Sequence, residues 1–333
     1  MKILYSIQGT GNGHLSRAKS ILPYLEKYGQ VDYLISGRNY CLDFPVKMKY
    51  HCHGVSFKYD NKGGIDYLKT FKSLSVKQFF KEVNEIPVHQ YDFVINDFEP
   101  VTVRACKQKK VPCISFSHHA SFLSSKVPMP PGRKDYLAWS IMKNYARTKN
   151  NIGLHFEPYD DFIFTPVIKD ELRNVTAQNE GHITVYLSSF SLDNLYKIFS
   201  KFPQYKFEVF HCDVEVAWRK HNIEFKPANS KMFNQSLLHS NGLIAHAGFE
   251  TPAEAFYLGK PMFLFPIKNQ FEQACNAAAA EKLGAVVAYK IDDRLESKIR
   301  CWLEDKKGVQ IDFPHHTDFL IQQVISRAEN IKN

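Results

Sequence analysis

The stretch HAGFETPAEAFYLGKPMFLFPIKNQFEQACNAAA, which covers His246–Ala279, carries two turns between a strand and a helix. Two short apolar runs, GLIAHA at 242–247 and PMFLFPI at 261–267, predict buried strands. The segments 251–259 and 273–284 predict the helices that follow them. Buried strands that alternate with helices predict a parallel sheet covered on both faces.

The same alternation occupies the rest of the chain. We expect strands at 2–7, 31–36, 91–97, 111–117, 183–189 and 206–211, and helices at 13–29, 98–110 and 192–202. The polar stretch 173–182 makes a linker. The sequence therefore predicts an α/β protein of two Rossmann-like, doubly wound domains, residues 1–170 and 171–333. The final helix is a candidate to pack back on the first domain. Because open parallel sheets bind ligands at the carboxyl ends of their strands, a ligand is expected in the cleft between them.

Composition narrows the class of protein. The 333 residues are 44% apolar and 23% charged, as in ordinary globular proteins, and no run of about 18 uncharged apolar residues predicts a membrane span. Seven scattered cysteines favour reduced thiols and a cytoplasmic location. The cluster HCHG at His51–Gly54 is not expected to bind metal, because adjacent ligands cannot easily close one tetrahedral site.

The positive charge is concentrated in the first half of the chain. Residues 1–150 hold 23 Lys and Arg against 11 Asp and Glu, whereas the remainder holds 20 against 23. This surface is either simply solvated or faces an anionic membrane or a phosphate-bearing acceptor. No nucleic-acid motif accompanies the charge, so nucleic acid is not an expected partner. The amphipathic segment 136–142 fits either core packing or an interfacial face.

The glycine-rich stretch SIQGTGNGHLSRA, Ser6–Ala18, does not fit a dinucleotide-binding loop. Its glycines are spaced G-x-G-x-G, and Ser36 and Gly37 stand where the ribose-binding acid would be. A tight glycine turn still lets the backbone approach a ligand closely. His14 begins the helix that follows, and a helix N-terminus disfavours the imidazolium. A neutral imidazole there could accept a proton.

The segment His246–Ala279 resembles the donor-binding signature of inverting, nucleotide-sugar-dependent glycosyltransferases of the GT-B fold. The form H-x-G-W-N-S-x-x-E-x-x-x-x-G-x-P, then a proline, then D-Q-x-x-N, is matched here by His246, Gly248, Phe249, Glu250, Thr251, Glu254, Gly259, Pro261, Pro266, Glu272, Gln273 and Asn276. Trp-Asn-Ser becomes Phe-Glu-Thr, and two extra residues fall between Pro266 and Glu272.

The loop GNGHLSRA resembles the G-G-x-G-G-H and G-x-G-H loops of family 28 glycosyltransferases, which include the peptidoglycan N-acetylglucosaminyltransferase and the galactolipid synthases. DFEP at Asp97–Pro100 is similar to a segment of an uncharacterised group among these relatives. The two resemblances together imply a two-domain GT-B fold with an acceptor-binding first domain and a donor-binding second domain.

The resemblance implies a donor site around the helix that follows AHAGFET. Its N–H groups suit a diphosphate, beside His246 as a donor to phosphate, and Thr251 is a plausible N-cap. Glu254 could accept both ribose hydroxyls, and Glu272 and Gln273 stand where relatives bind the sugar. The remaining donor-binding candidates are Gly11, Gly13, Ser189, Gly248, Phe249 and Glu250, with Phe225 and Met232 as walls for the base or as ordinary packing.

The same comparison bears on stereochemistry. Retaining relatives place a glutamate eight residues before the equivalent of Glu254, and this chain has His246 there, which favours inversion. His14 is the candidate base, with Asp97 as its orienting partner or an alternative base. His118, His119 and Arg17 are candidates for the acceptor site.

No Asp-x-Asp motif of the metal-dependent GT-A fold occurs, so no metal and no cofactor is expected beyond the nucleotide-sugar itself. We therefore expect a cytoplasmic hexosyltransferase that uses a UDP-sugar and a lipid, glycan or small-molecule acceptor, in glycolipid or cell-envelope glycan synthesis. The first domain could contact the inner face of the membrane. The alternatives are a UDP-sugar 2-epimerase of the same fold and a non-catalytic sugar-nucleotide sensor.

Overall fold

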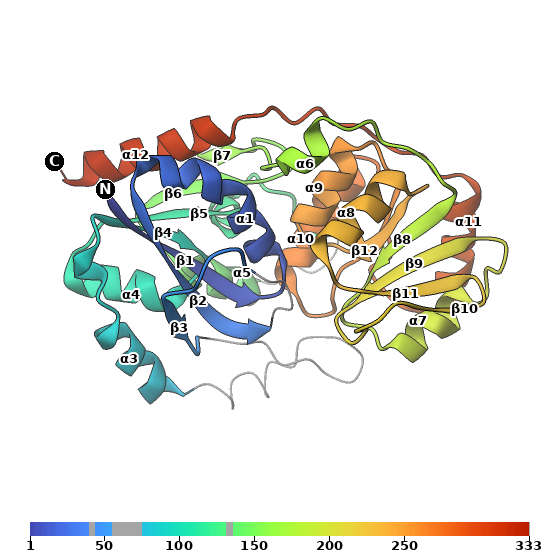
Figure 1. Ribbon diagram of the computed structural model, residues 1–333, viewed down its shortest axis with the longest axis horizontal. Helices are drawn as coiled ribbons and strands as arrows, with labels where there is room; N and C mark the ends of the chain where they lie inside the picture. Colours follow the sequence, from blue (N-terminus) through green and yellow to red (C-terminus); the bar gives the residue numbers. More distant parts are fainter. Residues whose placement is uncertain (40–43, 55–74, 131–135, 333) are drawn as a thin grey trace.

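The computed structural model describes residues 1–39, 44–54, 75–130 and 136–332, and it contains two sheets that lie side by side with helices around each (Figure 1). The strands of the first sheet are all parallel, in the order β3-β2-β1-β4-β5-β6-β7. Their bounds are β1 Lys2–Thr10, β2 Gln30–Asn39, β3 Tyr50–Cys52, β4 Phe93–Asp97, β5 Cys113–Ser117, β6 Asn150–Leu154 and β7 Ile163–Phe164.

The second sheet has the order β10-β11-β9-β8-β12-β13-β14 and is parallel except for the β10–β11 pair. Its strands are β8 His182–Tyr186, β9 Lys206–His211, β10 Trp218–Lys220, β11 Ile223–Pro227, β12 Leu243–His246, β13 Met262–Phe265 and β14 Val286–Val287. The predicted α/β class with two doubly wound sheets is therefore confirmed. The interior strands β1 and β12 are buried almost throughout, which explains why the sequence of each is mostly apolar.

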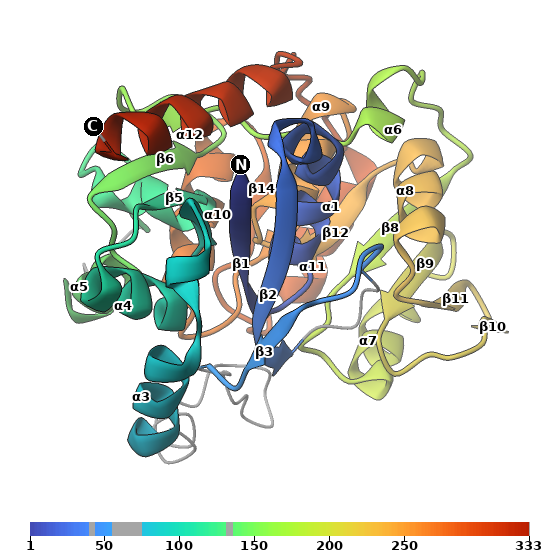
Figure 2. The same cartoon turned by 60° about the vertical axis from the view of Figure 1, so that its left-hand side comes forward.

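Helices cover both sheets. Those of the first half are α1 Gly13–Leu25, α3 Val76–Glu85, α4 Pro100–Lys109 and α5 Tyr136–Tyr145, with short 3-10 helices at Glu26–Tyr28, Val88–Gln90 and His118–Leu123. Those of the second half are α6 Asp170–Arg173, α7 Leu192–Phe199, α8 Ser230–His239, α9 Glu250–Tyr257, α10 Phe271–Lys282, α11 Leu295–Glu304 and α12 Thr317–Lys332. Helix α12 lies back on the first sheet, against α1 and β5 (Figure 2).

The two halves share one continuous apolar core. It joins Ile3 and Leu15 of the first half to Ala253 and Ala277 of the second. An aromatic contact sits at the junction, where Phe249 stacks on His118 with ring centroids 4.0 Å apart and planes within 4°. Burial of this kind holds two faces together without directional bonds, so the cleft between the domains has a packed floor.

Three local expectations need correction. The first predicted helix, 13–29, ends at Leu25 and continues only as a 3-10 turn. Helix α9 begins at Glu250, so Thr251 lies in its first turn and Phe249 takes the N-cap position without a side-chain cap. Cys212 is disulfide-bonded, so the expectation of reduced thiols fails at that position. In the ranges described above, no helix has the length and apolar character needed to cross a membrane.

Candidate active site

A cleft of about 460 Å³ opens between the carboxyl ends of the two sheets. Its lining on the first-domain side comes from the turn after β1, the start of α1, the 3-10 helix after β5 and Lys169. On the other side it comes from the ends of β8, β9 and β12 and from the first turns of α8, α9 and α10. The predicted residues that line it are Gly11, Gly13, His14, Arg17, His118, His119, Ser189, His246, Gly248, Phe249, Glu250, Thr251, Glu272 and Gln273.

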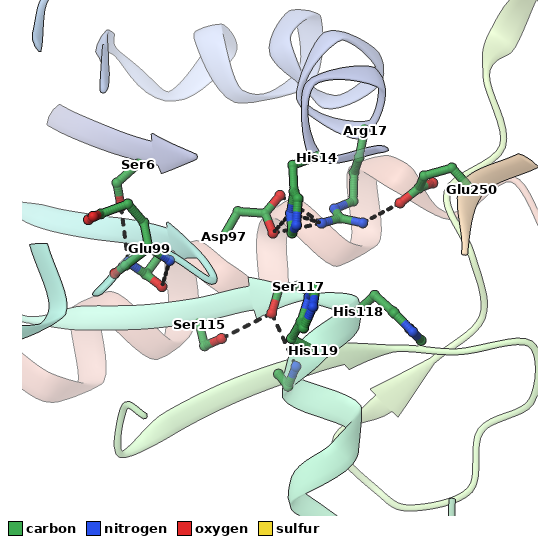
Figure 3. Close-up of polar contacts among 12 residues, drawn as sticks. Ser6, His14, Arg17, Asp97, Glu99, Ser115, Ser117, His118, His119 and Glu250 are labelled. Atoms are coloured by element: carbon green, nitrogen blue, oxygen red, sulfur yellow. Dashed lines mark hydrogen bonds and ion pairs between the residues drawn. The ribbon is translucent and has the colours of Figure 1, made fainter. Parts of the chain in front are cut away.

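His14 and Asp97 are brought together by two neighbouring strands. His14 stands in the first turn of α1, after Gly11 with a φ of +90° that favours glycine. Asp97 ends β4, which pairs with β1. The Nδ1 atom of His14 lies 2.8 Å from Oδ1 of the buried Asp97 carboxylate (Figure 3). A carboxylate on Nδ1 fixes the tautomer that leaves Nε2 able to accept a proton.

Arg17, one turn further along α1, also binds Asp97. Its Nη2 atom donates to both carboxylate oxygens, at 2.6 and 2.7 Å. The same Nη2 atom lies 3.2 Å from Nδ1 of His14, the other donor to this carboxylate. Burial alone would raise the pKa of Asp97, but Arg17 and His14 lower it to about 2. Asp97 is therefore a carboxylate at neutral pH, shared by two donors.

Arg17 reaches across the cleft as well. Its Nη1 atom donates to Glu250 at the start of α9, as Figure 3 shows. Burial raises the pKa of Glu250 to about 7, with Arg17 acting in the opposite direction and Glu254 and Asp97 adding to the rise. Sequence reasoning placed Arg17 with the acceptor and Glu250 with the donor, and the structure joins them in one ion pair.

Glu254 follows one turn later on α9 and is 3% exposed. Its carboxylate lies 2.8 Å from Nζ of Lys169, the residue before α6. Lys169 was not among the residues predicted from the sequence. Burial raises the pKa of Glu254, and Lys169 opposes that rise. Lys169 lines the cleft, whereas Glu254 lies behind it, so a ribose would have to reach Glu254 past or in place of this lysine.

His246 ends β12 and is held by both ring nitrogens. Nδ1 donates to the Phe265 carbonyl at 3.0 Å, and Nε2 accepts from the Ser189 N–H at 3.2 Å, with Ser189 Oγ at 2.9 Å. Burial lowers the pKa of His246 to about 4. The single N–H of the neutral ring is already used, so donation to a phosphate requires a second proton on His246.

Residues predicted for the acceptor site contact residues predicted for the sugar site. His119 Nε2 lies 3.0 Å from the Glu272 carboxylate, and His118 Nε2 lies 2.8 Å from the Asn276 side chain. The His119 ring also stacks on His14, with centroids 5.2 Å apart. Although burial alone would raise the pKa of Glu272, His119 and its neighbours hold it well below the usual range. Gln273 accepts from the Ile267 N–H at 2.9 Å.

The two residues expected to wall the base lie elsewhere. Phe225 is fully buried in the core of the second domain, and Met232 is 38% exposed, and neither is among the residues that line the cleft. Phe210 at the end of β9 and Phe233 on α8 line it instead, with ring centroids 5.3 Å apart. The predicted strand 206–211 could have pointed to Phe210, which stands one residue before the carboxyl end of that strand.

Polar residues that the sequence did not single out also line the cleft. Asn12 donates to Tyr186 across it at 2.9 Å, and Asn229 lies at the start of α8. Among residues 1–39, 44–54, 75–130 and 136–332, no group of three or more His, Cys, Asp or Glu side chains is arranged to hold a metal ion.

Comparison with known proteins identifies the family and the fold. A family model described as glycosyl transferase family 1 matches residues 1–305. No curated protein sequence matches the chain.

Solved structures are similar over nearly the whole chain. MurG from Acinetobacter baumannii is 13% identical, with a TM-score of 0.55 over 97% of this chain and 99% of that one. SsfS6 from Streptomyces sp. SF2575, complexed with thymidine diphosphate, is 11% identical, with a TM-score of 0.58 over 99% and 96%. UGT2 from Phytolacca americana, complexed with UDP-2fluoro-glucose and pterostilbene, is 11% identical, with a TM-score of 0.54 over 99% and 93%. At these identities the likeness shows the two-domain GT-B fold alone.

Proposed function

The chain belongs to glycosyl transferase family 1, and from this premise we propose that it transfers a sugar from a nucleoside-diphospho-sugar, a UDP-sugar, to a hydroxyl acceptor with inversion at the anomeric carbon. The observation that carries the proposal is the buried His14–Asp97 pair, 2.8 Å apart, in the same cleft as the first turn of α9. A base and an anion site on opposite walls are what a direct displacement requires.

In the proposed reaction His14 Nε2 takes the proton of the acceptor hydroxyl as its oxygen attacks the anomeric carbon. The bond from that carbon to the β-phosphate oxygen breaks on the opposite face, and the nucleoside diphosphate leaves with the electron pair. Asp97 stabilises the imidazolium that forms. A positioned base of this kind contributes about 10² to 10⁴ in rate.

On the donor side, the free N–H groups of the first turn of α9 and the hydroxyl of Thr251 would meet the diphosphate. Phe210 and Phe233 would hold the base, and Glu272 and Gln273 would contact the sugar. We assign the protein to the hexosyltransferases and expect no divalent metal in the reaction. Turnover should then persist in excess EDTA.

For the acceptor we propose a lipid or lipid-linked glycan at the inner face of the cytoplasmic membrane, as in glycolipid or cell-envelope glycan synthesis. Val76 and Phe80 on α3 are 66% and 54% exposed, and Ile141 on α5 is 57% exposed. A cavity of about 420 Å³ lies between α3, the start of α4 and the end of α5. Exposed apolar side chains beside lysines suit an anionic membrane surface. Co-sedimentation with anionic but not with neutral vesicles would support this step.

The first experiment is thermal unfolding with UDP, GDP, dTDP, ADP and NAD. A nucleotide at about 100 times its dissociation constant adds about 2.7 kcal/mol to the free energy of unfolding. We expect stabilisation by UDP that Glu254→Ala abolishes. Stabilisation by NAD alone, or by none of them, would overturn the donor assignment. Incubation of the protein with a UDP-sugar alone then separates a transferase from an epimerase, which would act without an acceptor.

A further inference from the structure

The ion pair between Arg17 and Glu250 is the direct electrostatic link between the His14–Asp97 pair and the donor helix. Arg17 is 3% exposed and its side chain is held at both ends of the guanidinium, by Asp97 on the first domain and by Glu250 on the second. A Cβ atom added to Gly13 would lie 3.6 Å from Cγ of Glu250, so the starts of α1 and α9 nearly touch here. The donor-binding signature H-x-G-W-N-S, which His246–Thr251 resembles, has asparagine where this chain has Glu250.

A glutamate at this position opposes diphosphate binding. The first turn of α9 attracts anions through its free N–H groups, and Glu250 places a buried carboxylate in that turn. Two anions held close together repel each other, so Glu250 should weaken the affinity for a diphosphate. A residue that weakens substrate binding needs another reason to be there.

The charges around His14 supply that reason. Arg17 puts one positive charge 3.2 Å from Nδ1 of His14, which by itself would oppose formation of the imidazolium and neutralise Asp97. Glu250 balances that charge from the far side of the guanidinium. The other groups that face His14 are the His119 ring stacked on it, Glu272 bound to His119, and the Tyr5 hydroxyl 3.5 Å from Asp97.

We propose that Glu250 is a positioning residue for the base: by neutralising Arg17 it leaves Asp97 free to stabilise the imidazolium on His14, at the cost of weaker diphosphate binding. The base then depends on the approach of α9 to α1, because the balancing charge belongs to the donor domain. This inference rests on the proposed function for its meaning in catalysis, but the electrostatic link itself can be measured without substrate.

The test is Glu250→Gln in the full chain, with UDP binding measured above pH 7 and the His14 titration followed over the whole range in which the imidazole gains its proton. Calorimetric titration with UDP should show tighter binding, by about three- to tenfold, because a like charge has been removed from the anion site. Nuclear magnetic resonance of labelled histidine, with His14 assigned by His14→Gln, should show the His14 titration moved to lower pH. Weaker UDP binding, or an unmoved His14 titration, would overturn the proposal.

Matched variants keep the result specific. Glu254→Gln removes a second buried carboxylate one turn later on the same helix, where it pairs with Lys169 rather than with Arg17. It should leave the His14 titration in place, and an equal movement in this variant would count against the proposal. Glu250→Asp keeps the charge and should restore the wild-type titration. If Glu250→Gln unfolds, Glu250→Ser carries the same test with room for water beside Arg17.

The two proposals fail in different ways. If neither UDP nor GDP, dTDP or ADP binds the wild-type protein or Glu250→Gln, the proposed glycosyl transfer loses its support. The His14 titration still decides whether Glu250 acts on the base, since it requires no nucleotide.

Discussion

The starts of α1 and α9 are built alike and charged oppositely. Each follows a buried interior strand, β1 or β12, through a glycine-containing turn, and each points its first turn into the same cleft. Helix α1 carries His14 and Arg17 on this side, whereas α9 carries Glu250 and Glu254. Both acids on α9 are paired with cations from residues 1–170, Arg17 and Lys169. The same local architecture thus yields a base on one wall and, on the other, an anion site that already contains the Glu250 carboxylate.

The largest effect is expected on the α1 side. His14→Gln should lower kcat by about 10³-fold, because it removes the proposed proton acceptor while leaving Asp97 bound to Arg17. The affinity for UDP should change less than threefold, since the nucleotide is assigned to the α9 wall. Initial rates and calorimetry on the same preparation check both values. A loss confined to nucleotide affinity would move the base elsewhere.

The next effect concerns the second ion pair of α9. Lys169→Met leaves the Glu254 carboxylate buried and unpaired, which should cost about 3 kcal/mol in the free energy of unfolding. Replacing both partners, as Lys169→Met with Glu254→Leu, should recover most of that loss. Urea unfolding monitored by circular dichroism measures the difference. If the single variant is as stable as the wild type, Lys169 is not neutralising Glu254 in solution.

The signs of the pH dependence should differ between the two walls. The pKa of Asp97 is lowered to about 2, so its stabilising contribution is present above pH 4 and is lost as the pH falls toward 2. The pKa of Glu250 is raised to about 7, so the folded state holds its proton more tightly than the unfolded chain. Stability then falls as the pH rises from about 4.5 to 7.

The contribution of Glu250 amounts to about 3 kcal/mol across that window. The test compares the free energies of unfolding of Glu250→Gln and the wild type at about pH 5 and at about pH 8. The difference, variant minus wild type, should be larger at pH 8 than at pH 5 by about 3 kcal/mol. No change in the difference between the two proteins would mean that Glu250 is ionised throughout, held so by Arg17.

The contrast also explains what the sequence could predict. The sequence predicted the strands β1, β4, β12 and β13, because a buried parallel strand has a mostly apolar sequence. The carboxyl ends of these strands then pointed to His14, Asp97 and His246. The ion-pair partners of the charged residues could not be predicted from the sequence. Arg17 and Glu250 are 233 residues apart, and Lys169 lies in a segment with no motif, so their pairing depends on how the domains pack. Phe225 illustrates the same limit, because its sequence context fits a wall for the base as well as ordinary packing, and only the geometry of the sheet assigns it to the core.

The smallest effect compares one hydroxyl on each wall. Thr251 on α9 and Ser16 on α1 both line the cleft within the first turns of their helices. Thr251→Val removes a proposed phosphate donor at nearly constant volume, and a single hydrogen bond of about 1 kcal/mol predicts a rise of about fivefold in the dissociation constant for UDP. Ser16→Ala should leave that constant unchanged, because Ser16 lies on α1, on the wall that is not assigned to the nucleotide. If Ser16→Ala weakens UDP binding and Thr251→Val does not, the nucleotide lies against α1, and the roles assigned to the two helices must be exchanged.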